Sequence, residues 1–173
     1  MLPMLVFFMA ACDNKDTSAT KTDSKDSSTA KMDYPYTIKN PDQWEMGDKT
    51  HTVNVLKSLK AYEIGNTDEA ASYFADSVRL RFDEMDVKIS NDSLKSMFKK
   101  WRAANKSVKV DMHDWESVKS KATNEEYVSL WYNQTTEDMK GKVDSLSVMN
   151  DMKIEKGKIV ELDEKTRKFP KKG

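Results

Sequence analysis

Residues 59–78 read LKAYEIGNTDEAASYFADSV, and this stretch decides the fold. Apolar residues at helical spacing over residues 50–63 predict a first helix, which the glycine at Gly65 ends. Thr67 then predicts the N-cap of a short second helix that turns Phe74 inward. The stretch therefore predicts two helices joined by a tight turn.

The residues that follow change to the periodicity of a strand. Val78, Leu80 and Phe82 alternate with charged residues, which is typical of a half-buried strand. Ser90 predicts the cap of a third helix, whose apolar stripe ends at Trp101. Four further strands are expected, at residues 108–118, 125–136, 143–154 and 158–164. This order predicts an α+β domain in which three N-terminal helices pack on a curved, mostly antiparallel sheet.

The same stretch resembles the opening of nuclear transport factor 2-like and SnoaL-like domains, most clearly at residues 74–76. Residues 128–132 and 155–160 are similar to the last strands of that family, so the resemblance covers about residues 50–165. It implies a cone, a strongly curved sheet wrapped round the helices. It also implies an apolar pocket that family members use for catalysis, ligand binding or partner contact. A shared fold does not fix the function.

Large aromatic residues are the pocket candidates. They are Tyr62, Phe82, Trp101, Trp131 and Tyr132. Core packing is the ordinary role of such side chains, and a ligand cage is the alternative. A shift of one residue in strand register would move Trp131 from the pocket face to the outer face of the sheet.

Few residues are candidates for acid–base chemistry in the pocket. The family's steroid-isomerase branch uses a tyrosine and an aspartate, whose places fall on Ser58 and Phe82 in this sequence. Asp83 would reach the pocket if the strand carries a bulge, and otherwise lies in an exposed turn. His113 titrates near neutral pH, but a single strand histidine is more often a surface or packing residue. We therefore expect a noncatalytic module for a small apolar ligand or a partner protein. An isomerase-like or cyclase-like enzyme that uses Asp83 or His113 is the alternative.

Other functions are disfavoured by the composition. The only histidines, His51 and His113, lack the spacing of a metal site, and no glycine-rich loop is present to hold phosphate, so we expect neither a metal nor a cofactor. Lys and Arg together number 29, as do Asp and Glu, which leaves no net positive charge to attract nucleic acid.

The N-terminal residues predict a lipoprotein. Residues 1–11 have the apolar character and length of a signal-peptide core. The sequence Met9-Ala10-Ala11-Cys12 resembles a lipobox, which implies cleavage before Cys12 and a lipid on its thiol. The sequence therefore predicts membrane attachment through the lipid on Cys12 and a location in the cell envelope, on the periplasmic face or the cell surface.

The composition also predicts the division of the chain. Residues 12–35 form the lipidated cysteine and a polar tether too poor in apolar residues to fold. The folded domain is expected at residues 36–169, followed by a basic tail at residues 170–173. If Tyr127 and Trp131 point outward from the sheet, they form an apolar patch that predicts a sheet-to-sheet homodimer.

Overall fold

A computed structural model describes residues 33–40 and 43–170 of the chain. The chain divides into two compact units, residues 1–38 and residues 39–173. The second unit contains every helix and strand of the described residues. The predicted signal segment, Cys12 and most of the predicted tether lie outside the described residues. No helix in the described part of the chain is long and apolar enough to cross a membrane.

Three helices and seven strands make up this unit. The helices are α1 (Lys49–Glu63), α2 (Thr67–Ser72) and α3 (Asn91–Ala103). The strands are β1 (Trp44–Met46), β2 (Phe74–Phe82), β3 (Met85–Ser90), β4 (Asn105–Ser120), β5 (Glu126–Asp138), β6 (Val143–Glu155) and β7 (Lys158–Lys168).

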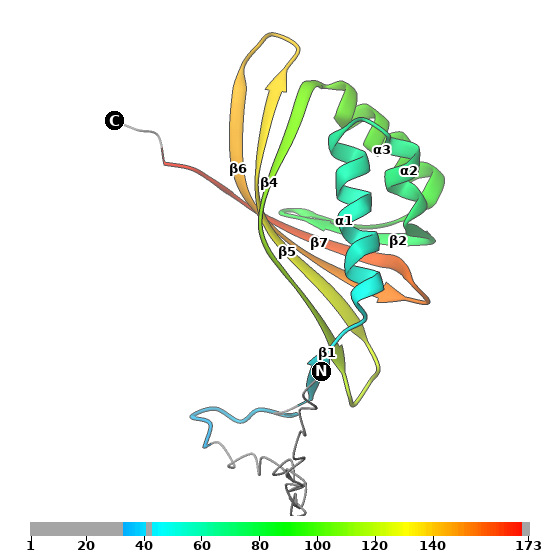
Figure 1. Cartoon of the computed structure of the whole chain (residues 1–173), viewed down its shortest axis with the longest axis vertical. Coiled ribbons are helices and arrows are strands. Elements are labelled where there is room, and N and C mark those ends of the chain that lie inside the picture. The colour runs from blue at the N-terminus through cyan, green and yellow to red at the C-terminus, as the bar shows by residue number, and fades with distance from the viewer. Residues whose placement is uncertain (1–32, 41–42, 171–173) are drawn as a thin grey trace, which may run out of the picture. The chain divides into compact units, whose positions relative to one another are not determined.

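The strands form one sheet in the order β1-β4-β5-β6-β7-β2-β3. Every pairing is antiparallel except that of β2 with β7, so the expectation of a mostly antiparallel α+β fold is confirmed. The sheet curls strongly, and the three helices lie within its concave side (Figure 1). We call this side the inner face and the opposite side the outer face.

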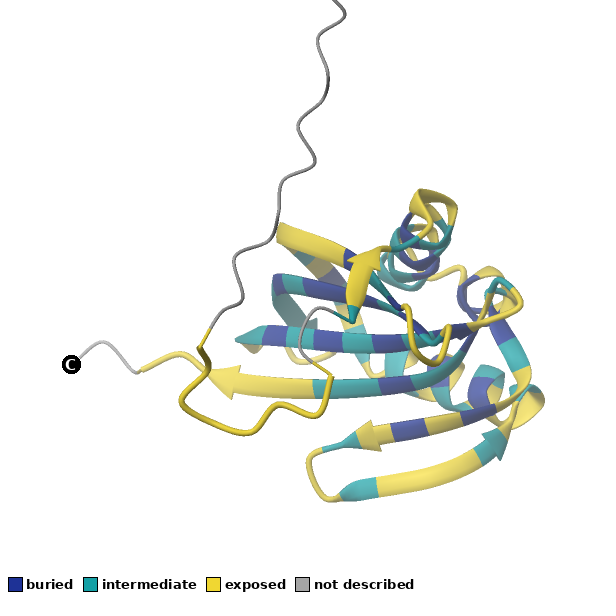
Figure 2. Cartoon of the chain, turned by 90° about the horizontal axis from the view of Figure 1, so that it is seen from below, coloured by how far each residue is buried: buried dark blue, intermediate teal, exposed yellow. Residues whose placement is uncertain are grey.

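The core lies between the helices and the inner face. Buried and more exposed residues alternate along the long strands (Figure 2). On β5, Val128, Leu130 and Tyr132 are at most 2% exposed and point inward, because successive side chains of a strand lie on opposite faces. From the helices, Val55 and Phe98 complete the apolar contact.

Local turn and cap chemistry places these elements. The Ser90 side chain accepts from the Ser93 amide and caps α3, as the sequence predicts. Gly65 ends α1 with a φ of 90°, a backbone conformation that favours glycine. Lys156 and Gly157 both have positive φ between β6 and β7, which is the geometry of a type I′ hairpin turn.

Two sequence predictions of local structure were wrong, and two strands were missed. Asn66, not Thr67, caps α2, because its side chain accepts from the Glu69 amide. Strand β2 begins at Phe74 rather than Val78, so Phe74 belongs to the sheet and not to a helix. Strands β3 and β1 were not predicted at all. Strand β1 has only three residues, too few for a period-two pattern, whereas in β3 Met85, Val87 and Ile89 do alternate with polar residues, so its signal was present and was missed.

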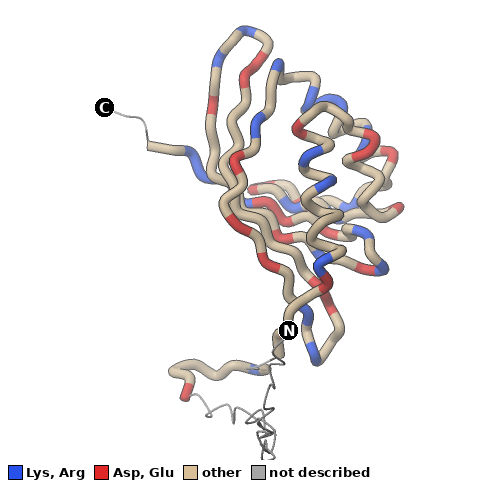
Figure 3. Tube along the Cα trace, viewed as in Figure 1, with Lys and Arg blue, Asp and Glu red and all other residues tan. Residues whose placement is uncertain are grey.

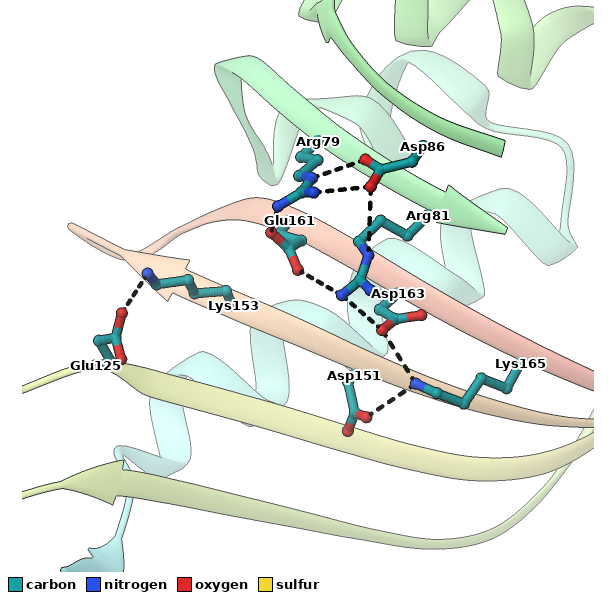
Figure 4. A network of polar contacts seen from close by, with 9 residues as sticks. All are labelled: Arg79, Arg81, Asp86, Glu125, Asp151, Lys153, Glu161, Asp163 and Lys165. Carbon is teal, nitrogen blue, oxygen red and sulfur yellow. Dashed lines mark hydrogen bonds and ion pairs between the residues drawn. The ribbon is translucent and has the colours of Figure 1, made fainter. Parts of the chain in front are cut away.

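The outer face carries a network of ion pairs across β3, β2, β7 and β6 (Figure 4). Arg79 makes a bidentate pair with Asp86, at 2.8 and 2.7 Å. Asp163 Oδ2 forms ion pairs with Arg81 Nη1 at 3.0 Å and with Lys165 Nζ at 3.1 Å. Charges of both signs are interspersed along the described chain (Figure 3). Across β3, β2, β7 and β6 the charges of this network are therefore balanced by neighbours of opposite sign.

Candidate functional site

A cavity of about 110 Å³ opens between the helices and the inner face of the sheet. Helices α1 and α3 form one wall, and strands β2, β5, β6 and β7 form the other. The lining residues are Ser58, Leu59, Tyr62, Phe74, Phe82, Phe98, Trp101, Tyr132, Gln134, Asn150, Met152, Leu162 and Glu164. Six of them are aromatic, and Glu164 is the only carboxylate among them.

Strand register positions the polar end of this pocket. Glu164 on β7 lies opposite Asn150 on β6 and beside Phe82 on β2. Glu164 follows the buried Leu162 by two residues and therefore points to the same inner face. The sheet thus carries a carboxyl group into a largely apolar cavity.

A chain of hydrogen bonds joins Glu164 to Tyr132 through the buried side chain of Asn150. With the Asn150 amide oriented to satisfy its neighbours, Nδ2 donates to Glu164 Oε2 at 3.1 Å and to the Met149 carbonyl at 3.3 Å. Asn150 Oδ1 then accepts from the Tyr132 hydroxyl at 3.0 Å. The opposite orientation would face the amide oxygen towards two acceptors, which is unfavourable. These hydrogen bonds fix the position of Glu164, and only one of its two carboxyl oxygens, Oε2, takes part in them.

The environment of Glu164 changes its acidity. Burial in the pocket raises the pKa of Glu164 to about 7, although the hydrogen bond from Asn150 opposes the change. The negative charge of Asp83 raises the same pKa further. Burial also raises the pKa of the Tyr132 hydroxyl, and the nearby Glu164 charge adds to that rise. Near neutral pH the pocket therefore holds a carboxyl group divided between its two protonation states and a neutral phenol.

The aromatic wall is a connected cluster on α1, α3 and β2. The Phe98 ring lies 5.3 Å from Tyr62 and 6.3 Å from Trp101, measured between centroids. The Phe82 and Trp101 rings meet edge to face at 5.7 Å and 81°. Such pairs have favourable quadrupole contacts and fix the ring orientations.

Four of the five predicted pocket aromatics line the cavity, namely Tyr62, Phe82, Trp101 and Tyr132. Trp131 does not line it. Trp131 is only partly buried and follows the inward-facing Leu130, so it points to the outer face.

The two candidate acid–base residues lie elsewhere. Asp83 is exposed in the turn between β2 and β3 with a φ of 39°, and it influences the pocket only through its charge. His113 is exposed on β4, where its Nε2 lies 3.7 Å from Asp111 Oδ2. Ser58 does line the pocket, but its hydroxyl donates to the Ala70 carbonyl at 2.8 Å and holds α1 against α2.

Sequence reasoning missed Glu164 and Asn150, the two polar residues that define the site. The sequence did contain a signal for both residues, because each occupies an inward position in the alternating pattern of its strand. Asn150 stands between Val148 and Met152 on the inner face of β6, and Glu164 follows Leu162 on β7. A polar residue in an inward register marks a buried polar site.

No group of three His, Cys, Asp or Glu side chains among residues 33–40 and 43–170 has the geometry to hold a metal ion. The pocket residues support binding through apolar contact and a hydrogen-bonding carboxyl group, or proton transfer by that group.

The arrangement of a curled sheet, three enclosed helices and a pocket between them is the nuclear transport factor 2-like fold. A nuclear transport factor 2-like protein of unknown function from Exiguobacterium sp. 255-15 superposes with a TM-score of 0.54 at 17% identity, over 66% of this chain and 98% of that one. An epoxide hydrolase from M. tuberculosis, described as LEH-like, gives 0.57 at 11% identity, over 69% and 84% of the two chains.

A third similar structure is a Mycobacterium tuberculosis protein in complex with estradiol-17beta-hemisuccinate. It gives a TM-score of 0.54 at 13% identity, over 66% of this chain and 92% of that one. No protein-family model and no curated protein matches the sequence. At these identities the likeness establishes the fold that the sequence resemblance predicts, and the function has to be argued from the site.

Proposed function

We propose that this domain is a binding module for a small, largely apolar molecule that carries one polar group. The observation that carries the proposal is the open-mouthed cavity with six aromatic side chains and a single carboxyl group at its polar end. Apolar walls with few polar groups are typical of small-molecule sites, in which the polar groups set the orientation of the ligand. The steroid derivative in complex with the similar mycobacterial protein supports a ligand with a largely apolar body.

The size of the cavity limits the part of the ligand that it encloses. An engineered protein cavity of about 150 Å³ binds benzene. A cavity of about 110 Å³ therefore fits one ring or a short alkyl segment. A larger ligand would leave its remaining part at the mouth of the pocket.

A matched pair of variants on α1 tests this proposal. Leu59 lines the cavity, whereas Leu56 is also partly buried on the same helix but does not line it. Leu59→Trp should fill the cavity and remove the rise in melting temperature that toluene causes in the wild-type protein. Leu56→Trp should keep that rise. Absence of any toluene effect on the wild-type protein would overturn the proposal.

Proton transfer is the second candidate function, because the pKa of Glu164 lies near neutral pH. A general acid or base works best with a pKa close to the working pH. If Glu164 acts on a bound carbonyl compound, the protein should speed the exchange of the methyl protons of acetophenone into D₂O, as followed by NMR. Glu164→Gln should lower that rate roughly a hundredfold or more. Equal rates in the two proteins would leave binding as the function.

We also propose that the module is attached to a membrane of the cell envelope through a lipid on Cys12. The proposal rests on the lipobox-like sequence of residues 9–12. A diacylated and N-acylated cysteine buries enough methylene groups to anchor a protein stably. Cys12→Ser should abolish the incorporation of radiolabelled palmitate, and incorporation that persists would contradict the proposal.

A homodimer through the outer face is a further part of this proposal. Trp44 is 48% exposed, and its ring lies 6.1 Å from that of Tyr127. Lys109 and Asp111 share the face with Trp131, so we expect a weak dimer. Sedimentation of the chain from residue 34 should show a dimer at high micromolar concentration, and a single monomeric species there would refute it.

A further inference from the structure

The pocket differs from a purely apolar ligand site because its lining carries an acidic group without a basic one. Its lining contains a carboxyl group and no Lys, Arg or His. Arg102 acts on Tyr62 through its charge, but it does not line the pocket, and its Nη1 donates to the Asn105 carbonyl at 2.7 Å. When Glu164 is ionised, no cation of the lining balances it.

Glu164 also has unused hydrogen-bonding capacity. Asn150 Nδ2 donates to Oε2, and among the described residues no donor is bonded to Oε1. A carboxylate oxygen accepts most strongly from a charged donor. The free oxygen of Glu164 is therefore a site for an N–H group that carries positive charge.

The aromatic side chains of the pocket also favour a positively charged ligand group. The faces of Tyr, Phe and Trp rings are electronegative and attract a cation within about 6 Å of the ring centroid. The rings of Phe82, Phe98 and Trp101 line the cavity at different tilts to one another. An anion would meet the Glu164 carboxylate and the charge of Asp83, both of which repel it.

We infer that the pocket selects a protonated amine on an apolar body about the size of one ring, with the ammonium group paired to Glu164 Oε1. This inference rests on the proposed binding function and names its ligand class. The bound ammonium group supplies the cation that the pocket lacks. The aromatic side chains of α1, α3 and β2 hold the apolar body.

Three compounds of similar size test the inference with the full chain, by calorimetry at pH 8. Benzylamine, benzyl alcohol and benzoate carry an ammonium, a hydroxyl and a carboxylate group on the same ring. Benzylamine should bind roughly tenfold tighter than benzyl alcohol, the difference between a charge-assisted and a neutral hydrogen bond. Benzoate should bind most weakly. Benzylamine affinity should also fall from pH 8 to pH 6, because protonation of Glu164 removes the anion.

A matched pair of variants on β7 locates the effect. Glu164→Gln should reduce the preference for benzylamine over benzyl alcohol to about one, whereas Glu161→Gln, on the outer face of the same strand, should leave it unchanged. Equal binding of benzylamine and benzyl alcohol to the wild-type protein would overturn the amine inference while the binding function stands. Failure of all three compounds, and of toluene, to bind would overturn both.

Discussion

Asp163 and Glu164 are consecutive residues of β7 that occupy opposite environments. Asp163 lies on the outer face between Arg81 and Lys165, with both cations within 3.1 Å. Glu164 lies on the inner face among aromatic rings, without a cation in the lining of its pocket. The alternation of a strand thus separates a carboxylate balanced by its neighbours from one left unbalanced in a cavity. Environment, and not residue type, distinguishes the paired carboxylate of Asp163 from the carboxyl group that we propose contacts a ligand.

The largest expected effect comes from the packing of the inner face. Phe98 is 7% exposed and contacts the rings of Tyr62, Phe74 and Trp101. Phe98→Ala should lower the free energy of unfolding by about 3–5 kcal/mol, because it leaves a cavity in the core. Trp101→Ala should cost less, since Trp101 is only partly buried at the pocket wall. Chemical denaturation measures both, and a larger loss for Trp101→Ala would contradict this ranking.

The second effect depends on pH and concerns Glu164. Its pKa of about 7 lies above the usual value of 4.5, so the folded protein holds this proton more tightly than the unfolded chain does. The free energy of unfolding should therefore fall as the pH rises from about 4.5 to 7 and then level off. Glu164→Gln should stabilise the protein by about 1–3 kcal/mol at pH 8, relative to its effect at pH 5. Denaturation at the two pH values tests this, with Glu161→Gln as the control. A variant whose effect is the same at both pH values would show that Glu164 is not desolvated.

A smaller effect is expected at the far end of the hydrogen-bond chain. Tyr132→Phe removes the hydroxyl that donates to Asn150 Oδ1 and leaves a buried acceptor without a partner. The expected loss is about 1–2 kcal/mol. The double variant with Asn150→Leu should lose less than the sum of the two single changes. Additive losses would show that the two side chains do not interact.

The smallest effect is expected on the outer face. Asp86 holds Arg79 in a bidentate pair, and the pair lowers the pKa of the Asp86 carboxyl group. Both side chains are exposed, so solvent and salt screen the interaction. Asp86→Asn should move the denaturation midpoint less than any inner-face variant and less still in 1 M salt. A shift as large as that of Tyr132→Phe would contradict the distinction between the two faces.

The sequence pattern predicted the fold well where elements are long and regular. The stripe that begins at Leu94 and the cap at Ser90 placed α3, and period-two alternation placed β4 to β7. It did not predict β1, whose three residues pair with the end of β4. Its pairing depends on a partner about 75 residues away, which local periodicity does not contain.

The candidate site was predicted only in part, for a different physical reason. Aromatic residues such as Tyr62 and Phe82 can be recognised as pocket candidates from their spacing. Whether Glu164 faces the pocket depends on which face of β7 the helices cover. Whether it has a hydrogen-bonding or charged partner depends on the residues that β6 and β2 place beside it. Candidates chosen by residue type and position, such as His113, proved to lie on the surface.

The position of β7 between β6 and β2 also sets the order in which the protein can be completed. Its pairing with β2 joins residues about 80 positions apart, as in the contact of Arg81 with Glu161. Closing so long a loop is slow relative to forming a helix or a hairpin. A ribosome must release the chain as far as Lys168 before all of β7 can enter the sheet. A chain that stops before β7 would therefore lack Leu162 and Glu164, and with them the polar end of the pocket.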